Sequence, residues 1–109
     1  MRILLPLLLA GLLGGCAGGA GCGAVLANAS ERPVEQFYLA PAGHPPAWGA
    51  NQLAERELPP GASLPIRIPG RGSFGMRAVW ADGQAAELAG LAGCGNRRVT
   101  VTEGGLRAE

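Results

Sequence analysis

Residues 74–83 read FGMRAVWADG, and this stretch decides the fold class. Its large apolar side chains recur at every second position from Phe74 to Trp80, which is the period of a strand that buries one face. The pair Asp82-Gly83 follows, and Asp-Gly supplies the positive-φ residues of a tight two-residue hairpin turn. The stretch therefore predicts a strand that turns back antiparallel, with residues 84–89 as the returning strand.

Four further runs have a strand-like period or a compact apolar composition. They are residues 24–28, 34–40, 64–68 and 99–102. Pro65 cannot donate a backbone hydrogen bond, so we expect its strand at the edge of a sheet. Short strands separated by turns every eight to twelve residues are typical of a sandwich or a small barrel. The sequence thus predicts an all-β fold, a small antiparallel β-sandwich of about six strands, in which only residues 51–57 look helical.

The beginning of the chain has the three-part pattern of a secretory signal peptide. Arg2 supplies a positive charge, residues 3–13 form an apolar core, and small residues follow. That core is shorter than the roughly 20 residues that cross a bilayer, so we do not expect a retained transmembrane helix. The next residues, Leu-Gly-Gly-Cys ending at Cys16, resemble the lipobox of bacterial lipoproteins. In those proteins cleavage precedes the cysteine, whose thiol carries lipid.

This resemblance implies three parts of the chain: a lipoprotein-type signal peptide (residues 1–15), a Gly/Ala tether (residues 16–23) and a single β domain (residues 24–109). Lipid on Cys16 would anchor the protein in a membrane of the cell envelope, facing the periplasm. Ala17 after the cysteine favours the outer membrane, by analogy with other lipoproteins. The alternative is ordinary cleavage after a small residue such as Ala20, which gives a soluble periplasmic protein.

The chain has three cysteines, and thiols of exported proteins tend to be paired because their environment is oxidising. If Cys16 carries lipid, Cys22 and Cys94 remain as an even pair that can form a disulfide. Closing so long a loop stabilises a fold by about 4 kcal/mol in the chain-entropy model. The alternative leaves Cys22 in a flexible tether and Cys94 as a small buried side chain. No C-x-x-C spacing occurs, and we expect no metal site and no cofactor.

A second resemblance covers residues 25–102. Its motifs are Asn28-x-Ser30, Pro33-Val34, Phe37-Tyr38-Leu39-Ala40-Pro41, Trp48-Gly49, Leu58-x-Pro60-Gly61, Arg77-x-Val79, Asp82-Gly83 and Cys94. Together they resemble a group of small secreted bacterial β-sandwich proteins of unknown function. Members of that group often carry a second cysteine shortly before the arginine of Arg-x-Val, where this chain has Gly72. The departure leaves Cys94 without that mate and raises interest in Cys22 as a substitute. The resemblance implies no activity.

Charge and loop residues limit the function classes. The formal charge is +1, from nine arginines and eight acidic residues, and no basic face stands out, so we do not expect a nucleic-acid partner. The only histidine, His44, lies in a proline-rich loop that we interpret as an exposed connector. Trp48 follows it, and it can serve as a binding anchor because exposed tryptophan supplies large apolar area. The alternative is that Trp48 folds back to close one end of the sandwich.

Two functions fit these residues. The first is a non-enzymatic accessory or binding module of the cell envelope, held to the membrane by Cys16, with His44 and Trp48 contacting a protein or envelope partner. The alternative is a soluble periplasmic protein with a metal-handling or hydrolytic role, using His44 with Met76 or a cysteine. One histidine and one methionine fall short of the usual metal ligand sets, so we expect no enzyme and no catalytic residue.

Overall fold

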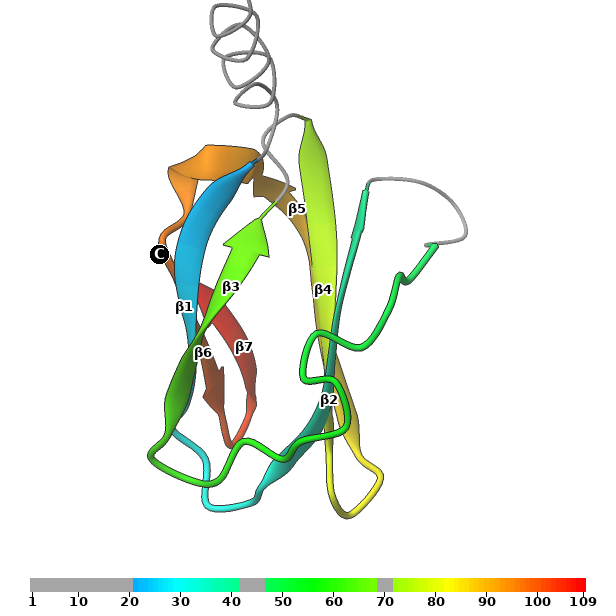
Figure 1. Cartoon of the computed structure of the whole chain (residues 1–109), viewed down its shortest axis with the longest axis vertical. Coiled ribbons are helices and arrows are strands. Elements are labelled where there is room, and N and C mark those ends of the chain that lie inside the picture. The colour runs from blue at the N-terminus through cyan, green and yellow to red at the C-terminus, as the bar shows by residue number, and fades with distance from the viewer. Residues whose placement is uncertain (1–20, 42–46, 69–71) are drawn as a thin grey trace, which may run out of the picture.

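The computed structural model describes residues 21–41, 47–68 and 72–109. They form two β-sheets that face each other (Figure 1). The strands are β1 (Cys22–Asn28), β2 (Val34–Pro41), β3 (Ser63–Ile68), β4 (Ser73–Trp80), β5 (Ala85–Ala92), β6 (Arg98–Thr102) and β7 (Gly105–Ala108), with one short 3₁₀ turn, η1 (Gly93–Gly95). The four-stranded sheet has the order β3-β1-β6-β7 and the three-stranded sheet the order β2-β4-β5. The predicted all-β class is confirmed, with seven strands in the described residues.

The β4–β5 hairpin is the antiparallel pairing that residues 74–83 predict. Its loop holds three residues instead of the expected two, because Trp80 N donates to Gln84 O at 2.8 Å and Gly83 N donates to Trp80 O at 2.9 Å. Gly83 has a φ of 90°, as the last position of a three-residue hairpin loop requires. Asp82 Oδ1 accepts a hydrogen bond from Gln84 N at 3.0 Å and fixes the loop from the side.

The four-stranded sheet is not antiparallel throughout, which differs from the expected topology. β1 pairs antiparallel with β3 but parallel with β6. The chain reaches β6 from η1, which is linked to the beginning of β1, and so β6 runs in the same direction as β1. β3 lies at the edge of this sheet, as Pro65 predicts.

Two element boundaries also differ from the sequence-based expectation. β1 already begins at Cys22, so the last two residues of the expected tether belong to the sheet, where Cys22 lies opposite Ile68. β7 is an additional strand, joined to β6 by a hairpin in which Thr102 lies opposite Gly105. β7 has only one large apolar residue, Leu106, and therefore no alternation that would predict it.

The core lies between the two sheets and is made of the residues that alternate inward along the strands. Its largest fully buried apolar side chains are Phe37, Phe74, Leu26, Ile68, Met76, Val34, Val99 and Val101. Both sheets contribute to this list, so the apolar faces of the sheets cover each other. The packing accounts for the period of two that the sequence shows in β3, β4 and β6.

Residues 47–58 run beside the free edge of β2. Asn51 Oδ1 accepts hydrogen bonds from Phe37 N and Leu53 N, both at 3.0 Å. The expected helix over residues 51–57 does not form, because Ala54 and Glu55 have φ values of 50° and 71° in the left-handed region. The segment instead covers edge groups of β2 that would otherwise be open to another strand.

Three expectations fall on other parts of the chain. The signal peptide, Cys16 and His44 lie outside the described residues. Among residues 21–41, 47–68 and 72–109, no helix has the length and apolar character needed to cross a bilayer.

The left-handed backbone at Gly83 gives a first prediction. Gly83→Ala should lower the free energy of unfolding by about 1–2 kcal/mol, because a Cβ is disfavoured at positive φ. No atom within 4 Å would meet that Cβ, so backbone strain alone causes the loss. Gly104→Ala is the matched control, since Gly104 lies in the β6–β7 hairpin, has equal space and is not among the residues with positive φ. Urea unfolding of both variants measures the difference, and equal stabilities would contradict the assigned loop.

Candidate functional site

Arg32, in the turn between β1 and β2, joins two hairpins of the sandwich. Its Nη1 lies 3.1 Å from Asp82 Oδ2 and donates to Gln84 Oε1 at 3.0 Å. Its Nη2 donates to the carbonyl oxygen of Glu103 at 3.3 Å and so reaches the β6–β7 hairpin. The guanidinium carbon lies 4.0 Å from the centre of the Trp80 ring, which is a cation–π contact. One side chain therefore holds both sheets together at this end.

A buried polar network beneath Arg32 fixes the turn that carries it. Asn28 is 1% exposed, and its Nδ2 donates to Arg32 O at 2.8 Å and to Leu58 O at 3.0 Å. Its Oδ1 accepts from Ser30 N at 2.9 Å, as expected for a capped turn at these residues. Trp80 Nε1 donates to Ser30 Oγ at 3.1 Å. In the described residues no buried side-chain nitrogen or oxygen lacks a partner, so this network is a finished structural element.

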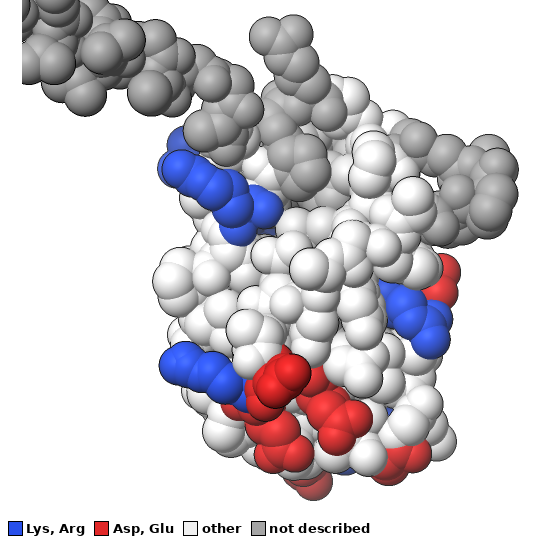
Figure 2. Space-filling model, turned by 45° about the vertical axis from the view of Figure 1, so that its right-hand side comes forward, with Lys and Arg blue, Asp and Glu red and all other residues white. Residues whose placement is uncertain are grey.

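Carboxylates gather around this end of the molecule (Figure 2). Glu31, Asp82 and Glu103 lie on the three turns, and Glu35 and Glu57 flank the bridge between Val34 and Leu58. The pKa of Asp82 is held below its ordinary value of 3.8, first by the hydrogen bond from the Gln84 backbone and then by Arg32. Asp82 is therefore ionised at neutral pH, where it acts as a hydrogen-bond acceptor and not as a proton donor.

The lowered pKa of Asp82 gives a second prediction. The ionised carboxylate stabilises the folded protein above the unfolded pKa near 3.8, and this contribution is lost as the pH falls through the lower folded pKa. Asp82→Asn keeps the oxygen that accepts from Gln84 but has no charge, so it should be less stable than wild type at pH 7. Its deficit should shrink below about pH 4. Urea unfolding at pH 7, 5 and 3 measures this.

The same experiment in an Arg32→Leu background separates the two causes. There the pH-dependent deficit should become smaller but persist, because the backbone of Gln84 still donates to residue 82. A deficit that is constant from pH 7 to 3 would contradict the assigned role of the Asp82 charge.

Cys22 and Cys94 form a disulfide, with their Cα atoms 5.5 Å apart. Of the two alternatives left open by the sequence, the structure contains the bridged one. The bond connects the first residue of β1, in the four-stranded sheet, to η1, directly after the last strand of the three-stranded sheet. Gly72 O accepts from Gly93 N at 3.3 Å. Gly72, the position where the resembling proteins often have a cysteine, thus lies beside the residue that precedes Cys94.

The disulfide gives a third prediction. The double substitution Cys22→Ala and Cys94→Ala should lower the free energy of unfolding by about 2–5 kcal/mol, because the open chain gains entropy when unfolded. Cys16→Ser is the control and should leave stability unchanged. Thiol titration of the unfolded, unreduced protein should find Cys22 and Cys94 unreactive, and two reactive thiols at these positions would contradict the bridge.

The residues required by the metal-handling or hydrolytic alternative are not brought together in the described structure. Met76 is fully buried in the core, and the bridged Cys22 and Cys94 have no thiolate to offer. In residues 21–41, 47–68 and 72–109, no three His, Cys, Asp or Glu side chains form a group that could hold a metal ion. His44 is outside these residues and remains a prediction.

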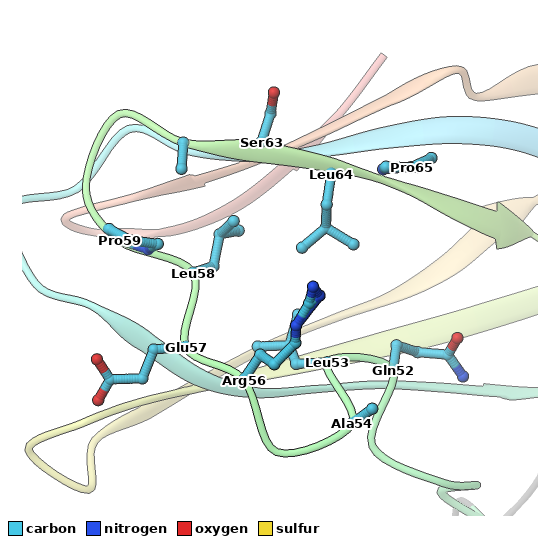
Figure 3. Close-up of a pocket in the computed structure, with 11 residues that line it drawn as sticks. Gln52, Leu53, Ala54, Arg56, Glu57, Leu58, Pro59, Ser63, Leu64 and Pro65 are labelled. Carbon is cyan, nitrogen blue, oxygen red and sulfur yellow. The ribbon is translucent and has the colours of Figure 1, made fainter.

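A groove of 510 Å³ lies between β3 and residues 52–58 (Figure 3). Its lining is Gln52, Leu53, Ala54, Arg56, Glu57, Leu58, Pro59, Ala62, Ser63, Leu64 and Pro65. Three leucines, Leu53, Leu58 and Leu64, give it an apolar interior, and Arg56 extends across it toward Leu64 in Figure 3. The groove thus combines apolar area with one cation, Arg56, and one carboxylate, Glu57.

Trp48 begins the chain segment that forms one wall of this groove. The side chain is half-buried, between the exposed anchor and the buried plug that the sequence allows. Gly49 N donates to Leu39 O at 3.3 Å and holds the segment against β2. Trp48 is therefore in a fixed segment and retains accessible surface for a partner.

The outer face of the four-stranded sheet carries an arginine face, defined as Arg67, Arg98 and Arg107. The sequence analysis found no basic face, because these residues are far apart along the chain. The strand order β3-β1-β6-β7 brings them onto one sheet, with Arg67 on β3, Arg98 on β6 and Arg107 on β7. Each of these arginines alternates with aliphatic residues in the sequence, and this alternation predicts that its side chain faces outward. It does not show which other strands lie beside it.

Comparisons with known proteins find no matching family model, no similar curated protein and no similar solved structure.

Proposed function

We propose that the protein is a lipid-anchored, non-enzymatic accessory module of the bacterial cell envelope, with the β domain facing the periplasm. In this proposal residues 1–15 are removed as a signal peptide, and Cys16 carries acyl chains. Several chains on one cysteine would make membrane attachment almost irreversible, since each buried methylene contributes about 0.8 kcal/mol. Ala17 favours the outer membrane.

The disulfide is the observation that carries the proposal. A bond between Cys22 and Cys94 fits a protein that folds in an oxidising compartment and therefore leaves the cytosol. It also uses two of the three cysteines and leaves Cys16 as the odd one. Cys16 follows the apolar run after two glycines, which is where a lipoprotein needs its acylated cysteine.

The roles of the polar side chains support a binding module over an enzyme. Asp82 is committed to the hairpin, and Asn28 and Ser30 to the buried network below Arg32. The groove beside β3 and the half-buried Trp48 offer apolar contact area without a nucleophile paired to a base. A protein or other envelope component that contacts this side, with His44 close in sequence, is the partner we propose.

Intact mass of the protein extracted from the membrane fraction tests the anchor. We expect a polypeptide that begins at Cys16 and carries the mass of added acyl chains. Cys16→Ser should move the protein from the membrane fraction to the soluble periplasmic fraction, while Cys22→Ser should not. An unmodified Cys16, or a mature chain that begins beyond it, would overturn the lipid anchor and favour a soluble periplasmic protein.

A further inference from the structure

The arginine face carries three arginines and one carboxylate. Glu109, directly after β7, exchanges backbone hydrogen bonds with Arg98 and lies on the same side of the sheet as Arg98 and Arg107. Arg67 lies opposite Gly23, Arg98 beside Val25, and Arg107 opposite Thr100. All three side chains point away from the core, because their strand neighbours Ile66, Ile68, Val99 and Leu106 face it. The strands β1, β3, β6 and β7 contain no acidic residue.

The face also has a useful size. With strands about 4.8 Å apart and a rise of about 3.3 Å per residue, the three arginines fall on a diagonal roughly 20 Å long. Between them lie small side chains on the outer side of the sheet, including Gly23 and Val25. Long guanidinium groups can therefore extend past their neighbours to a planar surface.

Most of the charge on this face is not neutralised within the described structure. Among these residues, Arg67 and Arg98 make no ion pair, whereas Arg32 and Arg77 do. Arg107 Nε lies 3.7 Å from Glu109 Oε2, but both side chains are about 60% exposed, so that pair contributes little. The carboxylates gather instead at the end formed by the β1–β2 turn and the two hairpins.

From this arrangement we infer that the arginine face docks on anionic phospholipid headgroups of the membrane that holds the protein. The inference rests on the proposed lipid anchor for its choice of occupant. Cys16 is five residues before Gly21, so a lipid on it keeps the start of β1 within about 18 Å of the bilayer. Arg67 is close to that start, because it pairs with Gly23.

The chemistry of the face matches phosphate. Guanidinium groups bind phosphate oxygens through two parallel hydrogen bonds, and they remain charged at any physiological pH. Each basic residue close to an anionic bilayer strengthens binding about fivefold, an effect that salt screens within a Debye length of about 10 Å. Docking would turn the groove beside β3 and the carboxylate-rich end toward other partners.

Vesicle binding tests the face separately from the anchor. The protein with Cys16→Ser, purified as the cell produces it, is mixed with vesicles of phosphatidylcholine alone or with 30% phosphatidylglycerol, on the order of 0.1 M salt. In this background, Arg67→Gln with Arg98→Gln should weaken partition onto the anionic vesicles about 25-fold. The matched comparison uses single substitutions. Arg67→Gln should weaken partition about fivefold, whereas Arg77→Gln, on the outer face of the three-stranded sheet, should change it less than about twofold.

Phenylglyoxal labelling gives a second measurement that requires no change to the face. Anionic vesicles should protect Arg67, Arg98 and Arg107 from modification but leave Arg56 reactive, as read by mass spectrometry. Equal partition onto both kinds of vesicle, or equal loss for Arg67→Gln and Arg77→Gln, would overturn the inference. Strong binding to soluble polyphosphate without vesicle binding would also overturn it. The mass of Cys16 decides the anchor independently of all these outcomes.

Discussion

The contact of Arg32 with the Trp80 ring is the interaction on which the shape of the sandwich most depends. A cation over an aromatic ring contributes about 0.5–2 kcal/mol, and here the same guanidinium also bonds to Asp82, Gln84 and Glu103. These residues belong to turns of both sheets, whose apolar faces alone would allow sliding. A domain of this size buries only about 60–65% of its unfolded surface, so it gains little margin from its core. The contacts of Arg32 at one end and the disulfide at the other add stability that the core alone does not supply.

This placement of the Arg32 contacts and the disulfide leaves the outer faces of the sheets free of the contacts that hold the ends together. The reactive groups of the described chain hold the two ends: Cys22 and Cys94 at one, and Asp82 at the other. The outer faces can then differ in charge without affecting the fold. The three-stranded sheet pairs Arg77 with Glu87 at 2.6 Å, whereas in the described residues Arg67 and Arg98 of the four-stranded sheet make no ion pair.

The sequence predicted the features that depend on interactions between residues close together in the chain. The period of two in β4, the hairpin at Asp82-Gly83 and the edge position of Pro65 all follow from short-range rules, and the structure confirms them, although the hairpin loop holds three residues and not two. The parallel pairing of β1 with β6 and the arginine face depend on strand order, which no single segment encodes. Residues 51–57 have the composition of a helix, but Asn51 bonds to β2 and holds the segment in turns. Cys16 and His44 remain predictions from sequence alone.

The disulfide lies where a force from the proposed tether would enter the β domain. Any pull from an anchor at Cys16 enters the domain at Gly21 and reaches Cys22 next. Cys22 belongs to β1, which is hydrogen-bonded on both sides, to β3 and to β6. β1 therefore cannot be peeled from its first residue without η1 being displaced with it. Load at the N-terminus is shared through the disulfide with η1, which connects β5 of the opposite sheet to β6. An entry strand stapled in this way lets a small domain hang from a membrane without unfolding from its attached end.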